Sequence, residues 1–157
     1  MSVVDAPFAL YAELGVDVVS LERMAKLLEH GLLDRLCAAG ERAHLDDAVA
    51  ADPGVGLDVV AATWAIKEAA VKVAGGRPPQ FGWHDIEVRH ASSDDPAPPL
   101  LAAALPSAGS NCPRRATFRW LTGACASGTA AWRTADGRVF AVASGQTDYG
   151  DPSEVRE

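Results

Sequence analysis

The stretch that decides the fold is residues 58–76, which read Asp-Val-Val-Ala-Ala-Thr-Trp-Ala-Ile-Lys-Glu-Ala-Ala-Val-Lys-Val-Ala-Gly-Gly. Its apolar residues at positions 59, 62, 66, 69, 70 and 73 recur with a period near 3.6, which is typical of a helix with one buried face. Asp58 is a candidate N-cap. The double glycine, followed by prolines at 78 and 79, ends the pattern. We therefore predict a long helix over residues 59–74.

One face of this helix carries side chains that are candidates for a functional site. Trp64, Glu68 and Lys72 are four residues apart, so they share that face. A carboxylate one turn before an ammonium can hold a metal and a phosphate side by side. Such Glu–Lys pairs are also common on solvated helices, where each contributes about 0.2–0.5 kcal/mol. The pattern alone favours the solvated pair, so a second observation has to decide.

Asp17 supplies that observation. Residues 14–19 read Leu-Gly-Val-Asp-Val-Val and predict a buried strand with one acid inside it. A buried carboxylate needs a cation, hydrogen-bond donors or a metal. The alternative is that Asp17 ends the strand and caps the next helix. Two carboxylates on separate elements, with a lysine nearby, also make a minimal site for Mg²⁺ and a diphosphate.

The remaining chain predicts helices first and strands afterwards. Ser20 is a candidate N-cap for a first helix, and a second short helix is expected over residues 32–38. Residues 48–56 read as a loop and residues 83–90 as a half-buried strand. Further strands are expected at 100–105, 117–122, 128–134 and 138–144, with Asp136-Gly137 as a hairpin turn between the last two. The order predicts an α+β domain with helices packed on an antiparallel sheet. We assign residues 13–145 to it, and 1–12 and 146–157 to flexible tails.

Composition excludes several classes of function. The chain has 157 residues, of which 48% are apolar and 22% charged, as expected for one globular domain. No apolar run is long enough to cross a membrane, and the N-terminus does not resemble a secretory signal. The net charge of −7 argues against a nucleic-acid partner. Three cysteines without paired spacing predict buried or half-buried free thiols and a cytoplasmic protein.

The ordered motifs resemble a known family. Residues 15–19 followed by 21–24 (Leu-Glu-Arg-Met) look like the opening of holo-acyl-carrier-protein synthases, the small 4′-phosphopantetheinyl transferases. Arg35 and Glu41 are similar to the arginine and glutamate that follow the family's first helix. Residues 64–73 resemble its central Trp/Phe-x-x-Lys-Glu-Ala-x-x-Lys motif, and residues 81–88 resemble the strand after it. The matches extend over about half of the chain.

The resemblance implies a 4′-phosphopantetheinyl transferase-like fold and a transferase of fatty-acid or polyketide biosynthesis. Mg²⁺ and coenzyme A would be used, and a serine of an apo acyl carrier protein would receive the phosphopantetheine arm. Family members of this size are typically trimers with sites between subunits, so a homotrimer is expected. By position, the resemblance implies four sets of residues: metal ligands Asp17 and Glu68; catalytic Glu68 and Lys72; coenzyme-binding Lys67, Lys72 and Arg77; and Arg23, Lys26 and Arg35 facing the carrier protein.

Three departures from the family pattern leave alternatives open. Thr63 stands where the family usually has an arginine, and residues 133–143 lack the Ser-x-Ser-His stretch of many members. The segment after the motif lysine is stiffened by two prolines. A divergent member that has lost coenzyme A chemistry is therefore the alternative. It would either do acid–base chemistry on a polyketide-like small molecule or serve as a scaffold that binds carrier proteins.

Overall fold

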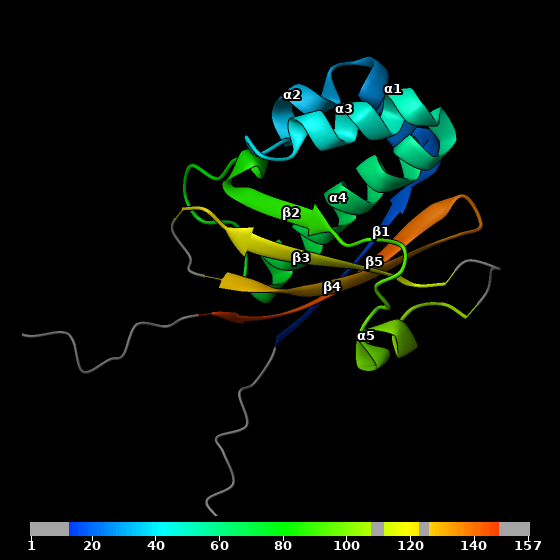
Figure 1. Cartoon of the computed structure of the whole chain (residues 1–157). Coiled ribbons are helices and arrows are strands. Elements are labelled where there is room, and N and C mark those ends of the chain that lie inside the picture. The colour runs from blue at the N-terminus through cyan, green and yellow to red at the C-terminus, as the bar shows by residue number, and fades with distance from the viewer. Residues whose placement is uncertain (1–12, 108–111, 123–125, 148–157) are drawn as a thin grey trace, which may run out of the picture.

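A computed structural model describes residues 13–107, 112–122 and 126–147 of the chain (Figure 1). The remaining residues, which include almost all of both predicted tails and Cys125, lie outside the described part. In chain order the elements are β1 (Glu13–Ser20), α1 (Leu21–Glu29), α2 (Leu32–Leu36), α3 (Arg42–Ala51), α4 (Pro53–Val73), the 3₁₀ turn η1 (Trp83–Asp85), β2 (Ile86–His90), α5 (Pro99–Ala103), β3 (Arg114–Trp120), β4 (Ala126–Ala135) and β5 (Arg138–Thr147).

The strands form one five-stranded sheet in the order β1-β5-β4-β3-β2, and every neighbouring pair is antiparallel. Strands β4 and β5 are joined by Asp136 and Gly137, whose φ angles of 50° and 69° give the predicted hairpin turn. The predicted α+β fold with helices on an antiparallel sheet is confirmed. β5 continues through Thr147, which lies inside the predicted C-terminal tail.

α4 crosses one face of the sheet and lies between it and the helices α1 and α3 (Figure 1). The helix is buried along most of its length, and all six apolar positions that the period singled out are buried. Small side chains let neighbouring elements approach it closely. Five alanines of α4 have no exposed surface: Ala61, Ala62, Ala65, Ala69 and Ala70.

The predicted start of the long helix is wrong. α4 begins at Pro53, and its N-cap is Asp52, whose carboxylate accepts hydrogen bonds from the amides of Gly54 and Val55 at 2.9 and 3.1 Å. Proline suits the first helical position because its missing N–H has no helical partner there. The glycines at 54 and 56 hid this signal, and they also suggested a loop where α3 runs through residue 51.

Other local predictions also need correction. The expected strand at 100–105 is the short helix α5. Helix α2 begins at Leu32 as predicted, but it ends at Leu36 instead of continuing to residue 38. Residues 83–85 form the turn η1, so only Ile86–His90 is a strand. Cys37 is half-buried as expected, whereas Cys112 is exposed; both thiols are free.

β1 is an edge strand rather than a buried one. Its residues alternate, so that Gly15 and Val19 are buried while Val16 and Val18 are 51% and 47% exposed. Asp17 is on the same face as Gly15 and Val19, which is the face covered by α4. No helix within the described ranges is long and apolar enough to cross a membrane.

Candidate functional site

A pocket of about 500 Å³ brings together side chains from β1, α1 and α4. Asp17 comes from the edge strand, Arg23 from the first helix, and Trp64, Glu68 and Lys72 from one face of α4. The shared face that the spacing predicted is therefore confirmed. It faces a cleft that also contains the second predicted carboxylate, so the solvated-pair interpretation of Glu68 and Lys72 does not hold.

Gly15 explains why the two carboxylates meet. A Cβ atom at this position would lie 2.0 Å from the carbonyl oxygen of Ala69, far inside van der Waals contact. Only glycine therefore lets β1 lie this close to α4. Asp17 follows two residues later on the same face of the strand, and Glu68 is the residue before Ala69. The close approach of the two backbones places both acids at one cleft.

The charged groups of the pocket are paired across these elements. The Lys72 ammonium donates to the carbonyl oxygen of Val16 at 2.5 Å and lies 3.1 Å from a carboxylate oxygen of Asp17. Glu68 has its own cation, because a guanidinium nitrogen of Arg77 lies 3.5 Å from its carboxylate. Asp17 is thus held by a cation and does not cap α1, where Ser20 is the N-cap.

Glu68 is electrostatically distinct from an ordinary surface acid. Burial raises its pKa, and the nearby charge of Asp17 raises it further, against the opposing charges of Arg77, Lys72 and Arg23. A carboxylate with a raised pKa is a better proton acceptor near neutral pH than an ordinary glutamate. The pocket therefore contains a candidate general base beside a lysine and a second carboxylate.

Arg77 connects the pocket to a group of aromatic side chains. Its guanidinium carbon lies 4.9 Å from the ring centroid of Trp83 and 5.9 Å from that of Phe81, and Trp64 packs against Trp83. A guanidinium over aromatic faces is held in place by cation–π attraction. These aromatic contacts thus keep Arg77 beside Glu68, where a phosphate group could also reach it.

The structure places Lys67 elsewhere. It is fully buried, and its ammonium donates to Glu41 at 2.7 Å and to the carbonyl oxygens of Leu36 and Trp83 at 2.5 and 3.0 Å. Burial lowers the pKa of Lys67, and the charge of Glu41 opposes that shift. With all three donors used inside the protein, Lys67 does not line the pocket. The buried partner of Lys67 is Glu41, one of the residues that carry the family resemblance in the sequence.

Thr63 also lies away from this pocket. Its hydroxyl donates to the carbonyl oxygen of Val59 at 2.9 Å and lies 2.8 Å from Nε2 of His90, from which it can then accept. Burial lowers the pKa of His90 to about 3, so this histidine is neutral at physiological pH. Because Thr63 does not line the Asp17–Glu68 pocket, the absence of an arginine at position 63 removes no side chain from that pocket.

Of the three residues predicted to face the carrier protein, only one lies at this pocket. Arg23 lines the pocket, whereas Lys26 and Arg35 are exposed and do not. Lys26 forms an ion pair with Glu22 at 2.9 Å. The sequence analysis did not assign two polar lining residues to the site, Ser20 and Arg138, which lie opposite each other in the β1–β5 register. Because that pairing joins the first and last strands, no local pattern could reveal it.

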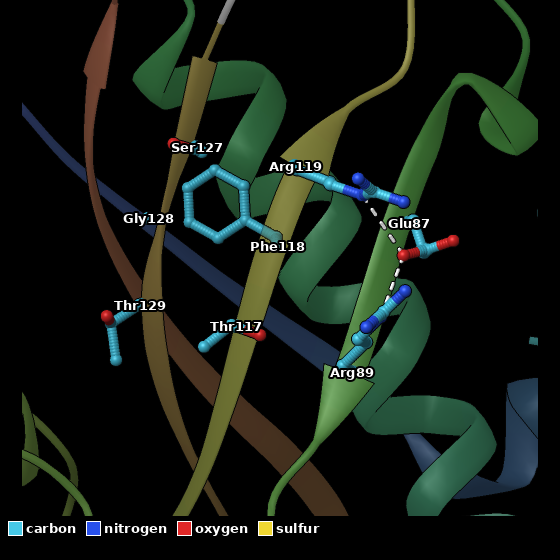
Figure 2. A pocket seen from close by; sticks show the side chains of 8 residues that line it. All are labelled: Glu87, Arg89, Thr117, Phe118, Arg119, Ser127, Gly128 and Thr129. Carbon is cyan, nitrogen blue, oxygen red and sulfur yellow. Dashed lines mark hydrogen bonds and ion pairs between the residues drawn. The ribbon is translucent and has the colours of Figure 1, made fainter. Parts of the chain in front are cut away.

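A different pocket, of about 380 Å³, lies on the sheet near β2 (Figure 2). Figure 2 shows Arg89 and Arg119 converging on Glu87, whose same oxygen accepts from both Nε atoms at 2.9 and 3.1 Å. Burial opposes ionisation of Glu87, but the two guanidinium groups prevail and lower its pKa. The Glu87 carboxylate is thus paired within the protein, and no predicted site residue lines this pocket.

Comparisons with known proteins agree on one family. Residues 13–121 match the sequence model of the 4′-phosphopantetheinyl transferase superfamily. A holo-[acyl-carrier-protein] synthase from Verminephrobacter eiseniae (strain EF01-2) is 37% identical over 87 residues, which make up 53% of this chain. The match spans 63% of that relative's length.

Two solved structures share the fold. The holo-ACP-synthase from Plasmodium yoelii has a TM-score of 0.52 at 15% identity and covers 84% of this chain and 91% of its own. The Helicobacter pylori holo-[acyl-carrier-protein] synthase in complex with coenzyme A has a TM-score of 0.52 at 18% identity, covering 87% of this chain and 100% of its own. At these identities the likeness concerns the fold.

Proposed function

The chain belongs to the 4′-phosphopantetheinyl transferase superfamily, and we propose that it transfers the 4′-phosphopantetheine arm of coenzyme A to a serine of an apo acyl carrier protein. The observation that carries this proposal is the meeting of Asp17, Glu68 and Lys72 in one pocket. The Verminephrobacter eiseniae relative and the two solved structures support it, because each is a holo-acyl-carrier-protein synthase.

The proposed reaction is a phosphoryl-type transfer. The serine hydroxyl oxygen forms a bond to the phosphorus that bears the pantetheine arm, while the bond from that phosphorus to the bridging diphosphate oxygen breaks. The electron pair of that bond leaves with 3′,5′-ADP, and the hydroxyl proton passes to Glu68, directly or through a water. The raised pKa of Glu68 favours this acceptance. Lys72 donates to a diphosphate oxygen and stabilises the charge that develops there.

Asp17 and Glu68 fit Mg²⁺ as ligands. The described residues contain no cluster of three or more His, Cys, Asp or Glu side chains, so the protein would supply these two carboxylates only. Magnesium is commonly bound by one or two carboxylates together with substrate phosphate oxygens. When bound, the ion would act as a Lewis acid on the diphosphate. Without it, Lys72 and Arg77 neutralise the two acids.

The remaining proposed roles follow from position. Lys72 lines the pocket and Arg77 pairs with Glu68, which supports the proposal that both contact coenzyme A phosphates; the position of Arg23 at the pocket supports its proposed role in facing the carrier protein. Lys26 and Arg35 would extend this basic surface. We also propose a homotrimer in the cytoplasm. The exposed apolar row on β1, where Leu14 is 63% exposed, supports burial of that strand between subunits, and the molar mass in solution tests it.

Isothermal titration calorimetry with coenzyme A tests the site. We expect saturable binding that is strengthened by Mg²⁺ in the unmodified protein. The variants Asp17→Asn and Glu68→Gln should lose the strengthening by Mg²⁺, because each removes a proposed ligand. Glu13→Gln is the matched control, since Glu13 is an exposed acid on the same strand. No coenzyme A binding would favour the alternative, a divergent member that has lost this chemistry.

A further inference from the structure

The pocket of about 380 Å³ that crosses β2, β3 and β4, here called the β2–β4 pocket, lies on the face of the sheet opposite α4 (Figure 2). Val88 on β2, Ala116 on β3 and Ala130 on β4 are in the core beside α4, so the residues that alternate with them face the other way. The polar lining residues all have this orientation: Glu87, Arg89, Thr117, Arg119, Ser127 and Thr129. None of them lines the Asp17–Glu68 pocket, so the proposed transfer reaction assigns them no role.

The strand register arranges these side chains in two rows across the sheet. From β2 through β3 to β4, the first row is Glu87, Arg119 and Ser127, and the second is Arg89, Thr117 and Thr129. Neighbouring strands lie about 4.8 Å apart, and residues two apart along a strand are separated by about 6.8 Å. Six polar side chains therefore share one small area of the sheet. The β2 side of this area carries the charges, and its β4 side carries hydroxyl groups.

Glu87 holds both guanidinium groups without using their terminal nitrogens. Arg89 and Arg119 each donate from Nε to the same oxygen of Glu87, which is only 7% exposed. A guanidinium has five N–H donors, and neither group makes another hydrogen bond or ion pair to the described residues. Two cations against one carboxylate also leave one positive charge in excess, in a chain whose net charge is −7. The β2–β4 pocket thus presents oriented donors that suit an anion.

We propose that the β2–β4 pocket binds a hydroxylated small molecule through its phosphate or carboxylate group. The terminal nitrogens of Arg89 and Arg119 donate to the anionic group, in the planar geometry that guanidinium groups offer to such oxygens. The hydroxyl groups of the ligand meet those of Ser127 and Thr129, because a hydroxyl can both donate and accept a hydrogen bond. The volume of about 380 Å³ is within the range of small-molecule pockets. This site is separate from the site of the transfer reaction.

Nuclear magnetic resonance of the arginine Nε–H groups tests the proposal on the full chain. Glycerol 3-phosphate and glycerate are titrated separately, which distinguishes a phosphate-bearing from a carboxylate-bearing ligand. Inorganic phosphate is the third probe and should bind more weakly than the tighter of the two organic anions, because it lacks their hydroxyl groups. We expect saturable shifts of the Arg89 and Arg119 signals with at least one organic anion. The Arg42 signal is the internal control, because its Nε donates to Asp46 and lies outside this pocket.

Two variants examine the two ends of the pocket. Arg119→Gln should weaken the binding of all three probes by about tenfold or more, because hydrogen bonds from a charged group are lost. Thr129→Val keeps the shape of the side chain and should weaken only the organic anions. Arg115→Gln is the matched control, since Arg115 is an exposed arginine on the same face of β3 that does not line the pocket. Circular dichroism establishes that each variant is folded.

A titration in the presence of saturating coenzyme A separates this proposal from the proposed transfer reaction. The affinity for the organic anion should be unchanged, because the two pockets share no residue. Competition by coenzyme A would overturn the proposal, since the anion would then occupy the transferase site. It is also overturned if no probe gives a saturable shift, or if Arg115→Gln weakens binding as much as Arg119→Gln. Inorganic phosphate that binds as tightly as both organic anions would refute the role of the hydroxyl groups.

Discussion

At the scale of single residues, the candidate site depends on how neighbouring charges change Glu68. Burial and the charge of Asp17 both raise the pKa of Glu68, while Lys72 and Arg77 oppose them. The charge of Asp17 thus disfavours the ionised form of Glu68 unless a cation lies beside the two acids. This arrangement is the one that the proposed roles of Glu68, as proton acceptor and as metal ligand, require.

Replacing Asp17 by asparagine is expected to lower the pKa of Glu68. The substitution removes a negative charge and leaves Arg77 and Lys72 in place, so the ionised form of Glu68 is favoured and its titration moves to lower pH. Carbon-13 magnetic resonance of the glutamate side chains in metal-free protein measures this shift. Glu22→Gln, an exposed acid on α1, should leave the titration unchanged. A rise in the pKa of Glu68 in Asp17→Asn would refute the coupling.

At the scale of elements, α4 separates two adjacent charged residues into different environments. Successive helix residues point about 100° apart, so Glu68 faces the pocket while Lys67 points into the protein. There the ammonium of Lys67 joins α2, η1 and Glu41, and Glu41 in turn accepts from the amides of Ala38 and Val88, each at 2.6 Å. The buried Lys67–Glu41 pair therefore links α4 to α2, η1 and β2.

Lys67→Met is expected to destabilise the protein by about 3–5 kcal/mol, because it leaves the carboxylate of Glu41 buried without its cation. Urea unfolding followed by circular dichroism measures the loss. The double variant Lys67→Met with Glu41→Gln should recover part of it, since no uncompensated charge then remains. Lys26→Met, which breaks an exposed ion pair, should cost little. An equally small loss for Lys67→Met would contradict the structural role of the pair.

The elements also show what the sequence can predict. The period of 3.6 along α4 selected six positions that are all buried, and the same geometry gave the Trp64–Glu68–Lys72 face. It did not show that α4 is buried on other sides as well, where residues such as Val60 and Ala65 also lie in the core. The same pattern could not assign Lys67, since a lysine beside a functional glutamate reads as exposed until Glu41 is seen to contact it. The start at Pro53 was missed because two glycines in the first turn weaken the helical signal.

At the scale of the whole molecule, long-range strand pairing builds the site. β1 pairs with β5, which is the last described strand, and this pairing brings Arg138 beside Ser20 at the pocket. Sequence reasoning foresaw the hairpin that precedes Arg138 but not its partner strand. It also took β1 for a buried strand, because alternating valines do not show whether a strand lies inside a sheet or at its edge. Asp17 and Glu68 line one pocket because an edge strand approaches α4 closely at Gly15, and not because β1 lies inside the sheet.

The central claim is that the pocket formed by Asp17, Glu68 and Lys72 transfers phosphopantetheine. The most direct measurement is the intact mass of an apo acyl carrier protein after incubation with this protein, coenzyme A and Mg²⁺. We predict that the carrier gains one phosphopantetheine arm, and that the gain is lost with Glu68→Gln. Carrier proteins of unchanged mass, or full transfer by the Glu68→Gln variant, would contradict the claim.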